Sequence, residues 1–568
     1  MKLTRLQFLV AAVLAGALAG TLVGGRVLAG SDRLDDRMKT FSQIIGAVQD
    51  RYVDEVSSED LIYDGIRGML RTLDPHTNFL DAENYKDMQD EQRGNFYGLG
   101  IVISKRTKED PLTVISPIDG TPAARLGVRA GDIISHISDA SRSIDVDTRE
   151  LSIQDAVKYL KGPKGSEVVI SIERPGLSEP LIFKIVRDKI DTPSVSNSYM
   201  IRPGVGYIKL ANFTQTSADD LDRAIAALRA RGMEKLIFDL RSNPGGLLDQ
   251  AVKVADRFLP DGKMIVYTHG RVQGSDQEFY STKTADDNEF PVVVLINRGS
   301  ASASEIVSGA LQDHDRALIV GETTFGKGLV QTIMPLRNVR GYALALTTAR
   351  YYTPSGRSIQ CDYASTSLDD YYSPRDRQAC GQGSGAAKLT DSGRKVYGGD
   401  GITPDYCVEA ETPAKFVSYL IGRQAFTGFA RRFEVERGQG QAQIAGTGTR
   451  SGPASAKVRI VSKDFRADAA ILTEFQGYLD TRKLRYTPAD LDENRAAIVR
   501  EIEDQVLMQA IGEGAARRRS VSWDPQIKKA LELVPRAEML LRDPRTFVAE
   551  RAREKQLADA APQLRAQH

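Results

Sequence analysis

The stretch that decides the fold runs from Asn297 to Gln331 and reads NRGSASASEIVSGALQDHDRALIVGETTFGKGLVQ. Small serines open an apolar segment with helical character, Ile306 to Leu311, and a short strand, Ala317 to Val320, follows it. A glycine-flanked lysine, Lys327, comes 25 residues after Ser302. Because a helix and a returning strand can bring the two ends of such a segment together, the pattern predicts a serine that lies beside a lysine.

This pair predicts a serine nucleophile with a lysine base. A serine hydroxyl is a poor nucleophile until a base takes its proton as the oxygen attacks a carbonyl carbon. Lysine can be that base only when neutral, so its pKa must fall by roughly 2 to 4 units from about 10.4, which burial in an apolar site supplies. The neighbours from Phe325 to Val330 add no other charge. Gln331 lies four residues beyond Lys327, on the same face, where a neutral amide can hydrogen-bond the amine without holding it protonated.

Ser302 has two alternative roles, one structural and one catalytic with a different base. Ser302 to Glu305 fits the capping box S-x-x-E, in which the serine merely accepts the amide hydrogens at a helix start. His314 is the histidine nearest to the serine in sequence, as a Ser-His enzyme would require. A helical separation of twelve residues would place this histidine roughly three turns away from Ser302.

A third alternative is nucleotide binding. Gly321 to Lys327 approaches the glycine-rich phosphate-binding loop, and Phe238-Asp239 could supply its magnesium-site aspartate. However, Gly328 stands where that loop needs Ser or Thr, and Leu329 to Leu336 has the pattern of a strand where the loop needs a helix.

Four motifs occur in order along the chain: DLRSNPGGLLDQAV from Asp239, GSASASEI from Gly299, LQDHDRA from Leu311 and GETTFGKGLVQ from Gly321. Together they resemble the carboxyl-terminal processing proteases, tail-specific serine proteases that use a Ser-Lys pair, over most of residues 36–410. The resemblance implies that Ser302 is the nucleophile, Lys327 the general base and Gln331 the residue that orients the lysine. Asp313 takes a family position for which we expect a structural role. The implied enzyme is a serine-type endopeptidase without cofactor or metal, on an α/β layered core of the crotonase/Clp-protease type.

An acyl-transfer site also needs hydrogen-bond donors for the oxyanion. Leu236 to Asp239 looks like a buried strand, and a sharp turn, Ser242 to Gly246, leads into a helix from Leu247. Glycines let backbone amides approach a ligand closely, and a helix start adds the positive end of a dipole. By resemblance, the amide of Gly245 or Gly246 forms the oxyanion hole with that of Ala303. An ordinary Pro-Gly turn is the alternative.

Composition limits the classes of function. The chain has 568 residues, so about three or four domains are expected. Its 76 Lys and Arg nearly balance 75 Asp and Glu, and a formal charge of +1 gives no field that would recruit nucleic acid. The five histidines are scattered without ligand spacing, which argues against a metal site. The three cysteines, Cys361, Cys380 and Cys407, cluster late in the chain, and an oxidising compartment would let two of them pair.

The amino terminus has the pattern of an export signal. Lys2 and Arg5 precede the uncharged residues 6–25, and Val27-Leu28-Ala29 fits cleavage after Ala29. The run of 20 uncharged residues is also long enough to span a bilayer, so an uncleaved inner-membrane anchor fits equally well. We therefore expect an exported protein, periplasmic or otherwise extracytoplasmic, with membrane association through residues 6–25 if they are retained.

The pattern from Phe96 to about Ile190 changes to short strands and turns and contains SPIDGTPAARLGVRAGDIISHI. It resembles a PDZ domain. Gly98, Leu99 and Gly100 match the loop whose amides capture a terminal carboxylate, and the strand from Ile101 to Ser104 can take a peptide as an added strand. The helix from Ile153 to Leu160 would form the other wall of the groove. The expected partners are thus the carboxyl-terminal tails of proteins or peptides.

We expect a multidomain α/β protein in which a PDZ domain and a protease core lie between helical end regions. The predicted segments are 1–35 (signal peptide or anchor), 36–95 (helical), 96–190 (PDZ), 191–410 (protease core) and 411–568 (helical, for packing or assembly). Apolar stripes in 36–95 fit packing on the chain's own core or, as in the family, a homo-oligomer. The carboxyl-terminal region contains a Gly- and Ser-rich linker at 438–456.

One segment departs from the family pattern. Family members pass almost directly from a TPSGRSIQ segment to a G-I-T-P-D segment, whereas this chain inserts the 40 residues Cys361 to Asp400. The insert is rich in Gly, Ser and Asp, which predicts a surface loop, stapled by Cys361 or Cys380 to Cys407.

The leading hypothesis is an exported Ser-Lys endopeptidase that binds protein tails. A non-catalytic PDZ scaffold with a relic protease domain and a P-loop-like nucleotide binder are the alternatives.

Overall fold

The computed structural model of the chain describes residues 34–565, except residues 106, 108–109, 175–176, 283–288, 373–379, 381–382, 384, 432 and 435–458. It divides into two compact units, one of Met1–Tyr85 with Gln331–Thr347 and the other of Lys86–Val330 with Thr348–His568. The export run at 6–25 and the linker at 438–456 lie outside the described residues. Within the part of the chain that is described, no helix is both long and apolar enough to cross a bilayer.

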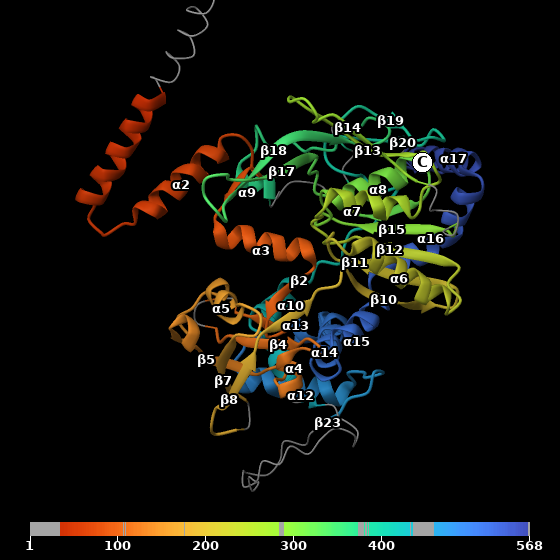
Figure 1. Cartoon of the computed structure of the whole chain (residues 1–568). Coiled ribbons are helices and arrows are strands. Elements are labelled where there is room, and N and C mark those ends of the chain that lie inside the picture. Colours follow the sequence, from red (N-terminus) through yellow and green to blue (C-terminus); the bar gives the residue numbers. More distant parts are fainter. Residues whose placement is uncertain are drawn as a thin grey trace, which may run out of the picture. The chain divides into compact units, whose positions relative to one another are not determined.

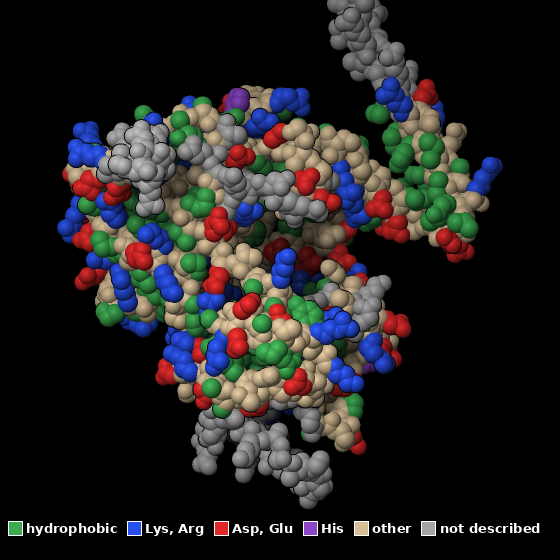
Figure 2. Space-filling view, turned by 180° about the vertical axis from the view of Figure 1, so that it is seen from behind, with side chains coloured by type: hydrophobic (Ala, Val, Ile, Leu, Met, Phe, Trp, Pro, Cys, Tyr) green, Lys and Arg blue, Asp and Glu red, His purple; other side chains and the backbone are tan. Residues whose placement is uncertain are grey.

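The first unit contains the amino-terminal helices and a small piece of sheet. Its elements are a helix over residues 34–51, α2 (Ser58–Arg71), β1 (Asn78–Leu80), the start of α3 (Ala82–Arg93), most of β17 (Leu329–Pro335) and the first half of β18 (Ala343–Tyr352). The rings of Tyr63, Phe79 and Tyr342 pack together and form its aromatic core, with centroids 5.2 to 6.0 Å apart. The predicted apolar stripe is partly open to solvent, since Phe41 and Ile44 are exposed on the first helix. Figure 2 shows hydrophobic side chains gathered on the surface of this unit.

The PDZ-like module belongs to the second unit and has its own sheet and core. Its elements are β3 (Ile101–Ser104), β4 (Thr113–Pro117), α4 (Pro122–Leu126), β5 (Ile133–Asp139), β6 (Ile144–Asp147), α5 (Ile153–Leu160), β7 (Glu167–Glu173) and β8 (Leu181–Val186). The strand order is β3-β4-β5-β7-β8, with β6 on β5, so β3 is an edge strand. The chain enters through β2 (Asn95–Gly98) and leaves through β9 (Asp188–Asp191), and these two strands pair antiparallel.

A six-stranded sheet organises the predicted core of residues 191–410 (Figure 1). Its order is β10 (Val195–Arg202), β11 (Val205–Leu210), β12 (Lys235–Asp239), β15 (Val292–Ile296), β16 (Leu318–Gly321) and β21 (Tyr406–Cys407). The pairs from β11 to β21 are parallel, whereas β10 is antiparallel to β11. All five residues of β15 are buried, because helices cover both faces of the sheet and neither face can be polar.

Alternating residues of the strands point to opposite faces of the sheet and belong to two separate hydrophobic clusters. On one face Phe238, Val292 and Val294 pack with helices α6 (Ser217–Arg229), α7 (Leu248–Asp256) and α8 (Ala303–Asp313). On the other face Ile237 and Val293 pack with α16 (Pro525–Arg542) and the start of α17 (Pro544–Arg565). A second sheet contains β13 (Met264–Gly270), β14 (Gln277–Tyr280) and the second half of β18.

The carboxyl-terminal region, residues 411–568, contributes helices to two hydrophobic cores. A first part has its own core and consists of α10 (Lys415–Gly422), α11 (Ala425–Ala430), β22 (Phe433–Glu434), β23 (Arg459–Ile460), α12 (Ala469–Thr481), α13 (Pro488–Glu493), α14 (Arg495–Ala510) and α15 (Glu513–Ser520). The last two helices, α16 and α17, instead share a core with the protease sheet, because their apolar side chains cover its second face.

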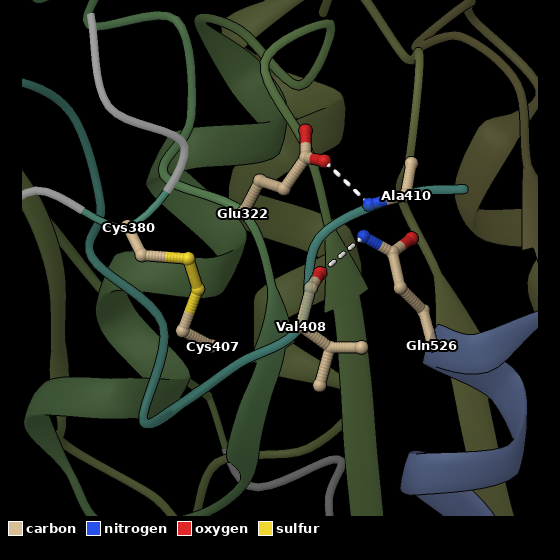
Figure 3. Close-up of a disulfide and its surroundings, with 6 residues drawn as sticks. All are labelled: Glu322, Cys380, Cys407, Val408, Ala410 and Gln526. Carbon is tan, nitrogen blue, oxygen red and sulfur yellow. Dashed lines mark hydrogen bonds between the residues drawn. A yellow bond between two sulfur atoms is a disulfide. The ribbon is translucent and has the colours of Figure 1, made fainter. Parts of the chain in front are cut away.

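The insert at 361–400 is more than the surface loop expected from its composition. It contains the short helix α9 (Leu368–Tyr372) and the paired strands β19 (Lys388–Leu389) and β20 (Lys395–Val396). Tyr371 and Val396 are buried, which requires the insert to pack against the rest of the unit. A disulfide joins Cys380 to Cys407, the second of the two pairings considered (Figure 3). Cys361 is buried.

Candidate active site

Three neighbouring strands deliver the predicted site to one edge of the sheet. β12 pairs in parallel with β15, and β15 with β16. The carboxyl ends of parallel strands meet at the same edge, where open α/β sheets bind their ligands. The glycine turn follows β12, Ser302 follows β15, and the segment that leads to Lys327 follows β16. The structure therefore brings together the three parts that the sequence motifs separate.

Ser302 occupies a strained position directly before α8. Its backbone angles are φ 54° and ψ −113°, a conformation that L residues rarely adopt and that costs on the order of 1 to 3 kcal/mol. Such strain persists only where the surroundings enforce it, and nucleophilic serines at sharp strand-to-helix turns show it. Here the preceding amide, that of Ala301, donates to the Asn243 carbonyl at 3.0 Å. The turn after β12 thus fixes the serine from one side.

Glu305 fixes the serine from the other side. Ser302 and Glu305 form the capping box that the tetrapeptide predicts, and the Ser302 amide donates to Glu305 Oε2 at 2.8 Å. The Glu305 amide also has a backbone acceptor, the Ser302 carbonyl oxygen, at 2.8 Å. The helix start can therefore persist when the Ser302 hydroxyl turns toward a substrate. Capping and nucleophilic attack are compatible roles for this residue.

The same carboxylate holds the lysine loop. Glu305 Oε2 accepts the Lys327 amide at 2.9 Å, while Oε1 accepts the Gly326 amide at 2.8 Å and the Thr324 hydroxyl at 2.6 Å. The Glu305 side chain is fully buried. Burial raises its pKa, and the hydrogen bonds from these groups act in the opposite direction. One buried carboxylate thus joins the backbones of Ser302 and Lys327.

Tyr351 on β18 makes a second connection between the two residues. Its hydroxyl donates to the Lys327 carbonyl oxygen and lies 3.2 Å from the Ser302 carbonyl oxygen. The Tyr351 side chain is buried, and burial raises the pKa of its phenol, which therefore stays a donor at neutral pH. Ser302 and Lys327 are accordingly neighbours across a shared hydroxyl, as the segment 297–331 predicts. Lys327 itself is half-buried.

The glycine turn lies directly against the serine. A Cβ at Gly245 would come within 2.8 Å of Ser302 Cβ and 2.9 Å of the Ala303 nitrogen, so only glycine fits there. Gly245 and Gly246 also have positive φ angles, 100° and 146°. The Gly245 amide donates to Asn243 Oδ1 at 2.9 Å, and this bond must open before that amide can bind an oxyanion. The oxyanion roles of Gly245, Gly246 and Ala303 stay predictions.

A buried ionic network supports the same turn. Asp239, at the end of β12, is fully buried and binds Arg241 through both carboxylate oxygens. Burial acts to raise the pKa of Asp239, but the charges of Arg241 and Lys209 outweigh this effect and hold it at about 2. Arg241 also donates to Asp524 Oδ2 at 2.7 Å, in the residue that caps α16. The turn is therefore tied to the carboxyl-terminal helices.

Two alternatives of the sequence analysis fail on geometry. His314 lies at the far end of α8 from Ser302, where its ring binds the Asp391 carboxylate at 2.9 Å and the Met264 carbonyl at 2.7 Å. It is therefore not the base of a Ser-His pair. The residues after Lys327 form strand β17 and not the helix of a phosphate-binding loop.

The remaining predicted residues have the following places. Asp313 is buried and pairs with Arg357, which fits the structural role expected of it. Gln331 lies on β17 in the first unit, where its side-chain amide donates to the His76 carbonyl. Its predicted contact with the Lys327 amine stays a prediction.

The PDZ-like module contains an apolar groove. It is lined by Phe96, Gly98, Leu99, Gly100, Ile101, Ile103, Val157, Leu160 and Lys161. The predicted carboxylate loop, Gly98 to Gly100, and the predicted wall, α5, both contribute. Since β3 is an edge strand, its outer backbone groups can pair with an extended peptide. Lys161 supplies the positive charge of the lining and also pairs with Asp87 at 3.1 Å.

A strained serine beside a lysine loop, with glycine amides against it, is suited to acyl transfer, and a peptide groove on the same chain indicates a polypeptide substrate. The fold and the site therefore define a serine-type peptidase with a PDZ domain.

Comparisons with known proteins agree. The model for peptidase family S41 matches residues 204–364, and a PDZ domain model matches residues 113–174. The carboxy-terminal-processing protease of Bartonella bacilliformis is 40% identical over 413 residues, which cover 72% of this chain and 83% of that protein. The carboxyl-terminal-processing protease of Synechocystis sp. is 37% identical over 317 residues, or 55% and 72% of the two chains.

Among solved structures, the photosystem II D1 C-terminal processing protease is 29% identical and covers 65% of this chain and 92% of its own, with a TM-score of 0.34. The chain belongs to the carboxy-terminal-processing proteases of peptidase family S41. The predicted family, fold class and enzyme class are confirmed.

Proposed function

We propose that this chain is an exported endopeptidase that binds the carboxyl-terminal tails of proteins in its PDZ groove and cleaves them with a Ser302–Lys327 dyad. The observation that carries the proposal is the double connection of these two residues through buried Glu305 and Tyr351. This arrangement holds a strained serine and the loop of a glycine-flanked lysine together.

The proposed reaction runs through an acyl-enzyme. Ser302 Oγ attacks the scissile carbonyl carbon while neutral Lys327 Nζ takes the hydroxyl proton. The oxyanion receives hydrogen bonds from the Ala303 amide and from an amide of the glycine turn. Lys327 returns the proton to the leaving amine as the peptide bond breaks. A water molecule then attacks the ester, with Lys327 again as base, and releases the new carboxyl end and Ser302.

Export is supported by two features. The charged start and uncharged residues 6–25 have the pattern of a secretory signal or anchor. The disulfide between Cys380 and Cys407 is of a kind that persists in oxidising compartments outside the cytoplasm. The proposed location is extracytoplasmic, with the protein either released or held at the membrane by its amino terminus.

The test of the reaction is to trap its covalent intermediate. Purified protein is incubated with a loosely folded substrate that ends in an apolar residue, quenched in acid, and measured by intact-mass spectrometry. We expect a mass increase equal to the acyl fragment on Ser302, and cleavage that Ser302→Ala abolishes. Tail binding without any cleavage or adduct would instead identify a PDZ scaffold with a relic protease domain.

Tail binding is tested separately by Val157→Glu. Val157 is half-buried in the groove, so a carboxylate there would lose solvation and repel the terminal carboxylate of the tail. We expect KM for a tail peptide to rise about tenfold, which corresponds to about 1.4 kcal/mol, with kcat at saturation unchanged. Gln154→Glu, at an exposed position of the same helix, adds the same charge outside the groove and is expected to leave KM unchanged. Equal KM values for Val157→Glu and the wild type would contradict tail binding in this groove.

A further inference from the structure

The insert at 361–400 contacts the loop that carries Lys327. Its helix α9 places Tyr371 edge-on against Phe325, with ring centroids 5.4 Å apart, and Tyr372 near the same ring at 6.2 Å. Phe325 precedes Lys327 by two residues. Tyr371 is only 4% exposed, which shows that this contact is part of a packed interior. The departure from the family pattern is thus located beside the base.

Backbone hydrogen bonds connect the same two segments. The Gly328 amide donates to Gln360 Oε1 at 2.8 Å, and the Cys361 amide donates to the Gly326 carbonyl at 2.9 Å. Gln360 also donates to the Tyr371 hydroxyl at 3.2 Å. The two residues that flank Lys327 are therefore bonded to the first residue of the insert, Cys361, and to the residue before it, Gln360. Gln360 connects Gly328 to α9.

The middle of the insert is fastened to the six-stranded sheet. The disulfide joins Cys380 to Cys407 on β21, and the residues after β21 are held in turn (Figure 3). Val408 accepts a hydrogen bond from Gln526 at 2.8 Å, and the Ala410 amide donates to Glu322 at 2.8 Å. The insert is anchored at its start and at its middle, so its first half is tied to the core at two points.

We propose that Tyr371 is a positioning residue for the general base: with Gln360 it holds the loop from Phe325 to Gly328 and excludes water from the Lys327 amine. This inference rests on the proposed Ser-Lys function and deepens it. Nothing in the reaction itself changes, because Tyr371 acts through the loop and not on the substrate.

The expected consequence follows from the solvation of the amine. Water stabilises the ammonium form of lysine, so a site opened to water has less neutral base at a given pH. The titratable groups packed against the loop include Glu305, Tyr351, Cys361, Tyr371 and Tyr372. Burial raises the pKa of the Tyr371 phenol, so this group stays neutral over the range in which the enzyme would be measured.

The experiment compares pH profiles of kcat/KM for the full chain and for three variants on one tail peptide. Tyr371→Ala is expected to move the acid limb of the profile upward by about one pH unit and to lower kcat at neutral pH about tenfold. Tyr371→Phe keeps the ring contact with Phe325 and is expected to restore the wild-type limb. Leu389→Ala, at an exposed site of the same insert, is the control for unspecific effects and is expected to match the wild type.

A double variant, Cys380→Ser with Cys407→Ser, releases the middle of the insert without changing the lysine loop. We expect it to shift the limb in the same direction as Tyr371→Ala but less. An unshifted acid limb in Tyr371→Ala, with kcat near the wild-type value, would overturn the inference while Ser302-dependent cleavage persists. Failure of the proposed Ser-Lys function would give a different result, because the Ser302→Ala variant would then still cleave the tail peptide.

Discussion

Lys327→Ala is expected to lower kcat for tail cleavage by roughly 10⁴-fold, the upper range for the loss of a general base. The Ser302 hydroxyl has no other base in the arrangement described, since His314 lies at the opposite end of α8. Glu305 is engaged with the backbones of Ser302 and Lys327 and cannot reach the hydroxyl proton without breaking those bonds. The measurement is the initial rate of peptide cleavage at saturating substrate, for the wild type and the variant.

The control separates chemistry from folding and tail binding. Lys327→Ala is expected to bind a tail peptide as tightly as the wild type, because the PDZ groove is built from other residues. Lys253→Ala removes an exposed lysine of α7 in the same core and is expected to keep full activity. The Lys327 assignment is wrong if its alanine variant retains activity within tenfold of the wild type.

The site could be predicted from sequence where its chemistry lies within short motifs. Ser302 and Lys327 belong to one strand-helix-strand segment, and a local pattern is enough to bring its ends together. The PDZ elements were equally predictable from the sequence. The strand Ile101–Ser104 and the helix Ile153–Leu160 were expected with the bounds that they have in the structure. In both cases the spacing of the hydrophobic residues and the positions of the glycines predict the helices, strands and turns.

The groups that hold the site were not predictable in this way. Tyr351 contacts Ser302 from a strand 49 residues later, and Arg241 binds Asp524 across 283 residues. Such contacts depend on tertiary packing, and a single sequence does not show which distant residues meet. Glu305 was noticed only as a cap, although its role as the acceptor of the lysine loop is larger. This role becomes visible only when the Glu305 carboxylate is found buried next to the Gly326 and Lys327 amides.

Glu305→Gln is expected to cause the second largest loss, because glutamine cannot replace the carboxylate at this position. Both carboxylate oxygens accept two hydrogen bonds, from Ser302 and Lys327 on one side and from Thr324 and Gly326 on the other. A glutamine has one oxygen, and its NH₂ group would face two buried donors. Each buried donor left unsatisfied costs about 1 to 3 kcal/mol.

We therefore expect the free energy of unfolding of Glu305→Gln to fall by about 3 to 5 kcal/mol, and kcat to fall by roughly 10² to 10³, as for other groups that hold a transition-state site. KM for the tail peptide should stay the same, since the groove is separate. An unchanged KM with a lower kcat distinguishes a misplaced site from a partly unfolded protein.

Glu322→Gln is the matched control: Glu322 Oε1 accepts one bond, from the Ala410 amide, and the oxygen of a glutamine can still accept it. Denaturant unfolding and initial rates at a temperature where both variants are folded provide the comparison. A Glu305→Gln protein with the kcat and stability of Glu322→Gln would show that the carboxylate does not hold Ser302 and Lys327 together.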